Sequence, residues 1–383
     1  MGAHLDLTVH SGQMRCNSVL VLNAGSSTLK FAMYEGNQLV CNGVENVDKG
    51  YREAVAAIVA KFEMHDAAIV AHRVVHGGVH FVEPTIVTPK VTEALEGIIG
   101  LAPLHQRPAV EVMKTITTLL PGSTQIACFD TAFHATLPMS EKRLAIPRHF
   151  FEQGIRRYGF HGLSYQSIAN QLTNISERAT IGKTIVCHLG SGSSLCGIVN
   201  RQSRYTSMGL TPLDGLMMGT RSGRIDPGFV LYLLHRGQSV SEIEQLLNMQ
   251  SGLVGVSQIS SDMRTLLASS EANAAEAVDM YCCAVAKEIG SAMVALQGID
   301  AIVFTAGIGE NCPSVRQSIV DRLRFLGIAI DSDANLQNRL QLHADNSRAH
   351  VFCIPTNEQQ VIRELVEPLL PVRLFSRFTV TPG

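Results

Sequence analysis

The sequence predicts an α/β protein with mixed sheets, built from two related halves. Short apolar runs rich in β-branched residues alternate with segments of helical periodicity, which is the pattern of α/β proteins. A strand–turn–strand segment near the start recurs in the middle of the chain, which indicates duplication. The 383 residues are 46% hydrophobic and 17% charged, enough for two or more domains and too apolar for a disordered chain.

Eight segments are predicted strands, because each is a short apolar run bounded by turn residues. They are 18–22, 29–34, 67–72, 125–129, 184–189, 194–200, 301–306 and 350–354. Seven segments are predicted helices from the spacing of their apolar residues: 51–63, 107–119, 164–173, 226–236, 240–248, 271–297 and 314–325. The longest of these stops at Gly298, a residue that commonly ends helices.

The repeated segment reads as strand, small-residue turn and strand in both copies, VLVLNAGSSTLKFAM and IVCHLGSGSSLCGIV. Aligning Ser27-Thr28-Leu29 with Ser193-Ser194-Leu195 superposes the two turns. Small residues let successive backbone N–H groups approach an anion closely. Either turn alone could be an ordinary hairpin, since Gly and Ser are common turn residues. Two such turns, each opening one half, predict facing domains that each offer a phosphate loop.

Charge and cysteine content exclude several classes of protein. Lys and Arg number 31 against 33 Asp and Glu, so the basic footprint of a nucleic-acid binder is missing. No apolar run approaches the ~20 residues of a membrane span. Residues 1–16 read as a polar extension and not as a secretory signal. Neither nucleic acid nor a membrane is therefore an expected partner. Nine cysteines without a CxxC pair indicate reduced thiols in a cytoplasmic protein.

Polar segments between the apolar runs carry the candidate chemistry. There is no GxxxxGK[ST] motif, which excludes a P-loop NTPase. The segment Gly307 to Asn311 follows a strand and precedes a helix, so it is a candidate nucleotide turn. Arg73 and Asp130 follow apolar strands, and charges at strand ends usually point into the cleft where open sheets bind ligands.

Eight motifs, in this order, resemble those of the acetate kinase family: NAGSSTLKF, HRVVHGG, APLH, FDTAFH, RYGFHG, TSMGLTPLDGLMMGTRSG, GIGEN and TNE. They span residues 18–363, and the family belongs to the superfamily of actin-like proteins, sugar kinases and chaperone ATPases. The resemblance implies two duplicated actin-like (ribonuclease H-like) ATPase domains with mixed sheets flanking a nucleotide cleft. The first would comprise 17–135 plus 359–383, and the second, with the nucleotide-binding loops, 136–358.

The resemblance also implies reversible, ATP-dependent phosphorylation of acetate to acetyl phosphate and ADP by a cytoplasmic homodimer that uses Mg²⁺, or alternatively Mn²⁺. Direct in-line transfer is expected, because no candidate nucleophile is obviously paired with a base and the two arginines suit one-step transfer. A general base is less necessary, because a carboxylate is already ionised at neutral pH. Propionate or another short acid is the alternative acceptor. A non-catalytic ATP-binding sensor of the same superfamily is the alternative class. The pair Arg73 and Arg221 favours the kinase, because a pure ATPase needs no carboxylate clamp.

The site residues implied by the resemblance fall into four groups. The catalytic residues would be Arg73, His105, Asp130, His161 and Arg221, and Arg73 would also bind the substrate together with Val75. The nucleotide-binding residues would be Lys30, His188, Gly190, Ser191, Gly192, Gly307, Ile308, Gly309, Glu310 and Asn311, and the metal-linked residues would be Asn23 and Glu358. Several of these residues could instead have purely structural roles. Arg73 could form a structural ion pair, and Asp130 could be a turn residue. His105, His161 and Val75 could be core residues, and Glu358 could be an acid favoured at a helix N-terminus.

The chain departs from the usual family pattern at several positions. Ser191 stands in place of an Asn, Tyr205 in place of the Asp before TSMG, and Arg224 in place of the Asp after TRSG. Further departures are Gln106, Leu163, Tyr165 and Gln359. They predict a divergent member with altered nucleotide affinity.

Overall fold

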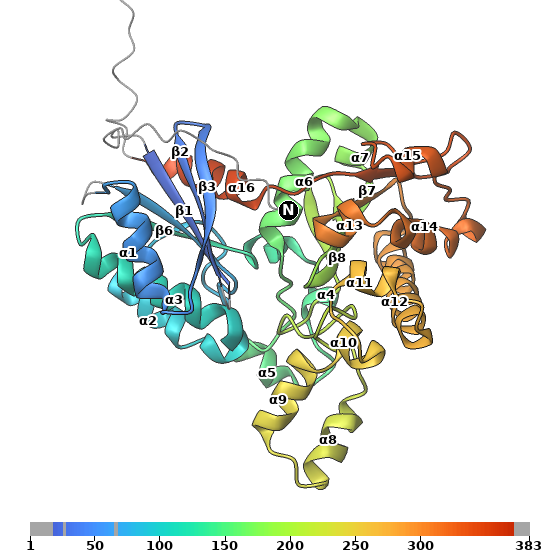
Figure 1. Cartoon of the computed structure of the whole chain (residues 1–383), viewed down its shortest axis with the longest axis horizontal. Coiled ribbons are helices and arrows are strands. Elements are labelled where there is room, and N and C mark those ends of the chain that lie inside the picture. The colour runs from blue at the N-terminus through green and yellow to red at the C-terminus, as the bar shows by residue number, and fades with distance from the viewer. Residues whose placement is uncertain (1–17, 26–27, 65–67, 371–383) are drawn as a thin grey trace, which may run out of the picture. The chain divides into compact units, whose positions relative to one another are not determined.

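The computed structural model describes residues 18–25, 28–64 and 68–370, which form two compact units (Figure 1). The first unit takes the residues up to Val75, Glu83–Cys128 and those from Gln359 onward, and the second takes His76–Val82 and Phe129–Glu358. Residues 76–82 and 129–135 thus lie in the second unit, whereas the sequence placed them in the first domain. The expected polar extension, 1–16, lies outside the described residues, and the assignment of domains stays a prediction.

The first unit is a six-stranded sheet with helices. Its elements are β1 (Ser18–Ala24), β2 (Thr28–Glu35), β3 (Gln38–Asn46), α1 (Tyr51–Lys61), β4 (Ile69–Val74), β5 (Thr85–Ile86), α2 (Pro89–Glu96), η1 (Ile99–Leu101), α3 (Pro103–Leu119), β6 (Thr124–Phe129), α16 (Glu358–Val366) and η4 (Glu367–Leu369).

The strands of the first sheet run in the order β3-β2-β1-β4-β6-β5. β1 is antiparallel to β2 and parallel to β4, so the sheet is mixed. Leu22 and Phe31 pack on one face against Ile58 of α1 and Ile116 of α3, because alternate strand residues point to the same side. This packing leaves Asn23, the next residue of β1, on the opposite face.

The second unit is a five-stranded sheet with helices on both faces. Its elements are η2 (Ala132–Thr136), α4 (Met139–Lys142), α5 (Arg148–Glu152), α6 (Gly162–Ile175), α7 (Glu177–Ile181), β7 (Lys183–Leu189), β8 (Ser193–Val199), β9 (Gln202–Thr206), α8 (Pro227–His235), α9 (Val240–Met249), α10 (Gly252–Ser257), α11 (Met263–Ala268), α12 (Ala272–Leu296), β10 (Ala301–Thr305), α13 (Ala306–Asn311), α14 (Pro313–Asp321), η3 (Arg324–Leu326), α15 (Ser332–Leu336) and β11 (His350–Cys353).

The second sheet has the order β11-β10-β7-β8-β9. β7 is antiparallel to β8 and parallel to β10, which in turn is parallel to β11. Ile185 and Cys187 pack on one face with Val285 of α12, while Val186 packs on the other face with Ile168 of α6. The second unit is therefore a three-layer α/β structure with its core on both sides of the sheet.

The two sheets share one topology, which accounts for the sequence repeat. Strands β3-β2-β1-β4-β6 of the first sheet correspond to β9-β8-β7-β10-β11 of the second. The first strand of each sheet, β1 or β7, forms an antiparallel hairpin with the next strand and pairs with a parallel strand on its other side. The two small-residue turns therefore occupy equivalent places, one after β1 and one after β7. The predicted duplication of mixed α/β halves is confirmed.

Most expected elements are present, and three differences have local causes. The edge strands β3 and β9 were missed, because their residues are largely polar or exposed at the rim of each sheet. Helix α12 ends before Gln297, which itself adopts the left-handed conformation (φ 58°) ahead of Gly298. The segment Gly307 to Asn311 is the short helix α13, and the sharp bend falls at Ala306 (φ 66°).

Candidate active site

Three predicted residues of the first unit lie together on one face of its sheet. Arg73 of β4 donates a hydrogen bond from Nη1 to Asn23 Oδ1 of β1 over 3.2 Å. Lys30 of β2 is directly opposite Asn23 in the antiparallel register, and it is exposed. Directly paired residues project to the same side of a sheet. The first unit therefore presents two cations around one amide at the carboxyl end of β1.

The first small-residue turn follows this group and is tied to the adjacent helix. The amide of Gly25 donates to the carbonyl of Thr28 over 2.8 Å, and Tyr51 Oη of α1 donates to the carbonyl of Gly25. These bonds fix the described part of the turn relative to α1.

Val75 and His105 complete the predicted residues of the first unit. Val75 is buried, but β4 ends at Val74 and Val75 lies in a bend. Val75 therefore lies just beyond the regular strand that carries Arg73. His105 is half-buried in the first turn of α3, where its backbone amide donates to Ala102 O over 3.1 Å.

The second small-residue turn meets two predicted catalytic residues. A Cβ atom at Gly192 would lie 2.6 Å from Arg221 Nη2 and 3.4 Å from His161 Nε2. Only glycine leaves room for both side chains against this turn. Gly190 N donates to Gly192 O over 3.1 Å, and Ser193 Oγ donates to Gly190 O over 3.0 Å, which close the turn. The structure thus brings Gly192, Arg221 and His161 together.

His161 is oriented by two neighbours. It precedes α6 in the left-handed conformation (φ 57°), and its Nδ1 lies 2.7 Å from Ser194 Oγ, which also contacts Tyr165 Oη. Its ring stacks on His188 with a centroid distance of 4.1 Å, and His188 Nδ1 lies 2.8 Å from Ser164 Oγ. With Nδ1 engaged, Nε2 is the ring atom that faces the turn.

Arg221 is a cation without a carboxylate partner among the residues that the structure describes. Its Nη1 donates to the carbonyl of Pro212 over 2.7 Å, and no acidic side chain of the described residues pairs with it. Burial lowers the pKa of Arg221 to about 10, so the guanidinium remains charged at neutral pH. A half-buried cation without an acidic partner is suited to binding an anionic ligand.

Backbone hydrogen bonds hold the segment around Arg221 against the turn. Gly219 N donates to Ser191 O over 3.1 Å, and Met218 N donates to Arg221 O over 3.1 Å. Leu253 N of α10 donates to Met218 O over 2.8 Å. Ser191 thus contributes a backbone carbonyl to this arrangement, while the residue itself is exposed.

Asp130 directly follows β6 and is 1% exposed. Helix α6 packs so tightly against it that a Cβ atom at Gly162 would lie 1.9 Å from the carbonyl oxygen of Asp130. The adjacent Thr131 accepts a hydrogen bond from Gly77 N over 3.0 Å. Asp130 is therefore a buried carboxylate fixed close to the start of α6, which His161 precedes.

The predicted nucleotide turn is organised by Glu310 itself. Glu310 Oε1 accepts from Ala306 N over 2.8 Å, from Thr356 N over 3.2 Å and from Thr305 Oγ1 over 3.3 Å. The carboxylate thus stabilises the bend that starts α13. A Cβ atom at Gly307 would meet nothing within 4 Å, so the backbone at Gly307 is open to a ligand.

The sequence reading missed Arg316, which supports the same turn. Arg316 is 0% exposed, and Nη1 donates to Gly309 O over 2.8 Å and to Glu310 O over 3.0 Å. Its remaining donors bind Asn335 and Asn338. No local signal singled it out, because α14 also carries Ser314, Gln317, Ser318 and Asp321 and Arg316 reads as one more polar residue of the helix. Burial lowers its pKa, and all its neighbours are neutral oxygens.

The residues expected to bind a metal offer oxygen donors. Asn23 provides an amide oxygen, with one lone pair used by Arg73, and Glu358 is half-buried at the first position of α16. No cluster of three or more His, Cys, Asp or Glu side chains occurs in the described residues. Mg²⁺ prefers oxygen and is commonly held by one or two carboxylates together with substrate phosphates, so these donors fit it.

His134 is buried, and its ring nitrogens lie 2.8 Å from Ser203 Oγ and 3.0 Å from the carbonyl oxygen of Phe160. His72 is buried beside Gln125, with Nε2 2.8 Å from Oε1. Burial lowers the pKa of both imidazoles to about 4. Both are therefore neutral in the folded protein at physiological pH.

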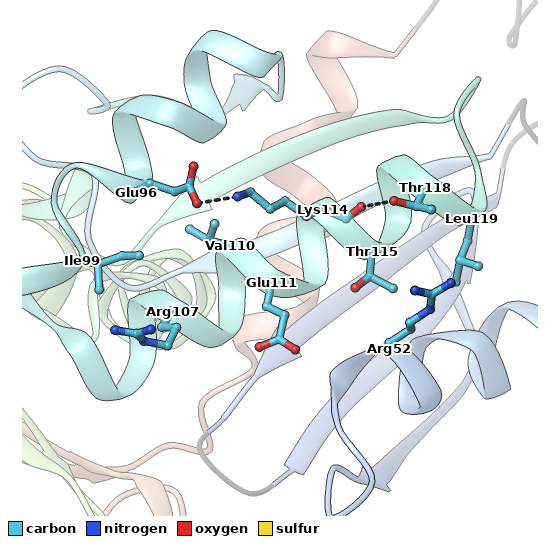
Figure 2. A pocket seen from close by; sticks show the side chains of 10 residues that line it. All are labelled: Arg52, Glu96, Ile99, Arg107, Val110, Glu111, Lys114, Thr115, Thr118 and Leu119. Atoms are coloured by element: carbon cyan, nitrogen blue, oxygen red, sulfur yellow. Dashed lines mark hydrogen bonds and ion pairs between the residues drawn. The ribbon is translucent and has the colours of Figure 1, made fainter.

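Two surface cavities lie outside the candidate site. One, of about 330 Å³, belongs to the first unit, where Lys114 pairs with Glu96 at 2.5 Å (Figure 2). The other, of about 660 Å³, belongs to the second unit and lies between residues 215–224 and the helices α10 and α12. None of the predicted site residues lines either cavity.

Two mixed sheets of one topology, each with a small-residue turn after its first strand, define a duplicated α/β protein of the actin-like ATPase class. The acetokinase family model matches residues 45–364. A protein named acetate kinase from Rhodopseudomonas palustris (strain TIE-1) is 44% identical over 382 residues, covering 90% of this chain and 96% of that protein. The chain belongs to the acetokinase family.

Solved structures agree with this assignment. A propionate kinase from Francisella tularensis subsp. tularensis SCHU S4 has a TM-score of 0.84 and 34% identity, over 91% of this chain and 98% of that chain. Porphyromonas gingivalis acetate kinase has a TM-score of 0.83 and 32% identity, over 93% and 100%. The resemblance seen in the sequence is confirmed, and with it the expected fold and kinase class.

Proposed function

We propose that this protein transfers the γ-phosphoryl group of ATP to acetate and forms acetyl phosphate and ADP in a reversible reaction. The observation that carries the proposal is Arg221, a charged guanidinium without an acidic partner that lies against the glycine turn beside His161. Relatives named acetate kinase, at 44% identity over 90% of the chain, support acetate as the acceptor.

The proposed roles follow from the charges that must be brought together. A carboxylate and a triphosphate repel each other, and arginine offers both of them planar bidentate donors. Arg73 would hold the carboxylate, and Arg221 with His161 Nε2 would stabilise the transferred phosphoryl group. The turns at Gly190 to Gly192 and at Gly307 would bind the nucleotide. Asp130 would orient an arginine or a water, because acetate needs no base.

A divalent metal would be held by the oxygen donors Asn23 and Glu358. When bound it would neutralise charge on the phosphates, as in other phosphoryl-transfer enzymes. We propose Mg²⁺, with Mn²⁺ as an alternative, because these cations accept oxygen ligands. Asn23 would then present its amide oxygen to the metal while Arg73 fixes the orientation of the amide.

We also propose a homodimer in the cytoplasm. Helix α8 is apolar around most of its circumference, yet Phe229, Leu231, Tyr232 and Leu234 are each at least 42% exposed. Such a helix face is normally covered in an assembled protein. The cysteines of the described residues are free thiols, which supports a reducing compartment. No helix in the described part of the chain has the length and apolar character of a membrane span.

The proposal is tested by formation of acetyl phosphate, trapped as the hydroxamate, from ATP, Mg²⁺ and acetate. Product should exceed the control without acetate, and Arg221→Ala should lower kcat by about 10³–10⁵, the range known for phosphoryl-transfer arginines. Arg264→Ala, which removes an exposed arginine paired with Asp262, is the matched control and should keep full activity. Binding of ATP with no acyl phosphate above that control would favour the non-catalytic sensor instead.

Direct transfer is tested with ATP that is chiral at the γ-phosphorus. A single in-line displacement inverts the configuration, whereas a phosphoenzyme formed and consumed in two steps retains it. We expect inversion, because Arg73 and Arg221 are suited to one-step transfer. Retention would point to a covalent intermediate on a residue such as His161 or Glu358.

A further inference from the structure

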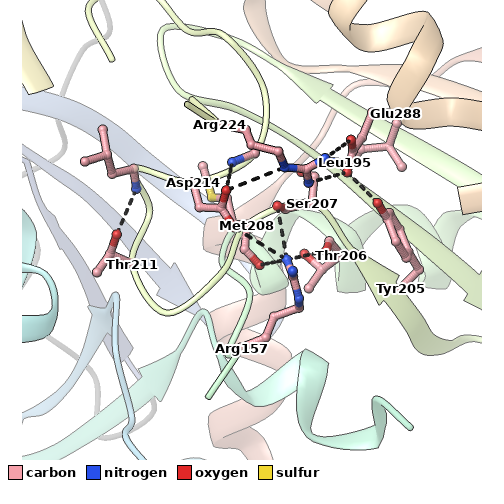
Figure 3. Close-up of polar contacts among 12 residues, drawn as sticks. Arg157, Leu195, Tyr205, Thr206, Ser207, Met208, Thr211, Asp214, Arg224 and Glu288 are labelled. Carbon is pink, nitrogen blue, oxygen red and sulfur yellow. Dashed lines mark hydrogen bonds and ion pairs between the residues drawn. The ribbon is translucent and has the colours of Figure 1, made fainter. Parts of the chain in front are cut away.

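The segment that carries Arg221, residues 207–226, is hereafter the Arg221 loop, and its two ends meet at one carboxylate. It begins after β9 and ends at Asp226, the N-cap of α8. Tyr205 Oη donates to Glu288 Oε1 over 2.5 Å at the start of the loop. Arg224 Nη1 and Nη2 donate to Glu288 Oε2 and Oε1, each over 3.4 Å, near its end (Figure 3).

Glu288 is well placed to fix these ends. Its side chain is 7% exposed, and it belongs to α12, the long helix whose residues Tyr281, Val285 and Ile289 pack in the core. A buried carboxylate is costly unless hydrogen bonds and an opposite charge compensate it. Tyr205 supplies a hydrogen bond, and Arg224 supplies hydrogen bonds and the opposite charge. The buried carboxylate of Glu288 is therefore fully stabilised only when both ends of the loop are in place.

A second arginine holds the first half of the loop. Arg157 Nη1 donates to the carbonyls of Thr206, Ser207 and Met208 over 3.1–3.3 Å and lies 3.7 Å from Asp214 Oδ2. Asp214 Oδ1 accepts from Gly215 N over 2.8 Å and lies 3.9 Å from Arg224 Nε. Figure 3 shows these side chains forming one connected polar group with Glu288.

One side of the Arg221 loop borders a cavity and is not closely packed. Leu216, Met217, Ser222 and Arg224 line the cavity of about 660 Å³ that Glu288 also borders. Where side chains do not fill the space, polar contacts must define the conformation. Arg221 lies only three residues before Arg224, so a shift at Arg224 would be transmitted to it along the chain.

We propose that Glu288 is a positioning residue that fixes Arg221 by holding both ends of the Arg221 loop through Tyr205 and Arg224. The two partners stand at the positions where the family pattern usually has Asp. An Asp at either position would face the buried Glu288 carboxylate, so Tyr205, Arg224 and Glu288 form a set in this chain. This inference rests on the proposed function, because it assigns Arg221 to phosphoryl transfer.

The first test compares Glu288→Gln and Glu288→Ala with the wild type. Glu288→Gln keeps an acceptor for Tyr205 and removes the charge opposite Arg224, so it is the variant that should fold. We expect kcat to fall about 10- to 100-fold, while KM for ATP and acetate changes less than about threefold, because small displacements of a catalytic group cost up to ~10² in rate. Asp279→Asn, which removes the Arg322 ion pair on the same helix, is the matched control and should leave kcat unchanged.

The second test asks whether the effect passes through Arg221. Residues that act as a unit are strongly non-additive. Adding Glu288→Gln to Arg221→Ala should therefore cost no further activity. A full additional loss of 10- to 100-fold in the double variant would overturn the proposal, since it would show a role independent of Arg221. An unchanged kcat in the single variant would also overturn it.

Hydrogen exchange of the free protein gives a readout that needs no activity. The amides of Met218 and Gly219, bonded to Arg221 O and Ser191 O, should exchange at least tenfold faster in Glu288→Gln, with α12 unchanged. Unchanged protection of the loop would contradict the proposal. The two proposals can fail separately. If the wild type forms no acetyl phosphate while Glu288→Gln still exchanges faster in the loop, the proposed function is refuted and the role of Glu288 in the loop stands.

Discussion

Arg73 and Asn23 lie on neighbouring parallel strands and share a hydrogen bond of 3.2 Å from Nη1 to Oδ1. The bond orients the guanidinium at the carboxyl end of β4. Asn23, being neutral, aligns Arg73 without cancelling its charge. The planar guanidinium carries parallel N–H donors of the kind that bind a carboxylate bidentately.

Replacing Arg73 tests this role. Arg73→Ala should remove most of the activity, by about 10³ or more in kcat/KM for acetate, if Arg73 contributes as other phosphoryl-transfer arginines do. Arg73→Lys should recover only part of it, because an ammonium group cannot bind a carboxylate bidentately. Steady-state kinetics with circular dichroism as the folding control measure both. A native spectrum with less than a tenfold loss would remove Arg73 from the site.

Gly192→Ala tests the contact between the turn and Arg221. The new Cβ would lie 2.6 Å from Arg221 Nη2, so the guanidinium must move. We expect kcat to fall by about 10², as for a catalytic group displaced by ~1 Å. The matched control is Gly290→Ala in α12, where a Cβ meets nothing within 4 Å and a helix gains about 0.5–1 kcal/mol. Equal activities of the two variants would contradict the assignment.

The acid preference provides a third test. Val75 is implied by the family resemblance to bind the substrate, and a valine beside the methyl group of acetate would shorten the pocket. Acetate should then be preferred over propionate by a modest factor, since one methylene is worth about 10- to 200-fold in kcat/KM. Val75→Ala should shift the ratio toward propionate. Measuring kcat/KM for both acids decides it, and an unchanged ratio in an active variant would make Val75 a core residue only.

Buried histidines predict loss of stability in acid. Burial lowers the pKa of His72, His76 and His134 to about 4, while the unfolded value is about 6.5. Between these values the unfolded chain binds more protons, so the free energy of unfolding falls as pH falls. Each histidine should cost about 2 kcal/mol at pH 5 relative to pH 8.

Thermal unfolding from pH 8 to pH 5 measures this effect. His72→Gln removes one of the titrating groups, so its Tm should depend less steeply on pH, whatever its Tm at pH 8. His235→Gln, which changes an exposed histidine, should retain the wild-type dependence. Identical pH dependence of His72→Gln and wild type would show that His72 is not a source of the acid lability.

The sequence alone determined the secondary structure elements, the duplication and the family, because these depend on local periodicity, turn residues and motifs read along the chain. The strands β1, β7 and β10 and the long helix α12 followed from apolar spacing within a few residues of where they are found. The edge strands β3 and β9 did not, since β3 is largely exposed and β9 is built mainly from polar residues.

Only the tertiary structure decided which distant residues meet. Arg221 and the ring of His161 both lie against the turn at Gly192 because the Arg221 loop is bonded to Ser191 and α10, and no local pattern encodes such packing. The same holds for Tyr205 and Arg224, whose departures from the family pattern were visible in the sequence while their common partner Glu288 was not. Glu288 is 64 residues or more away from both, and a buried carboxylate finds its donors through the packing of helix against loop.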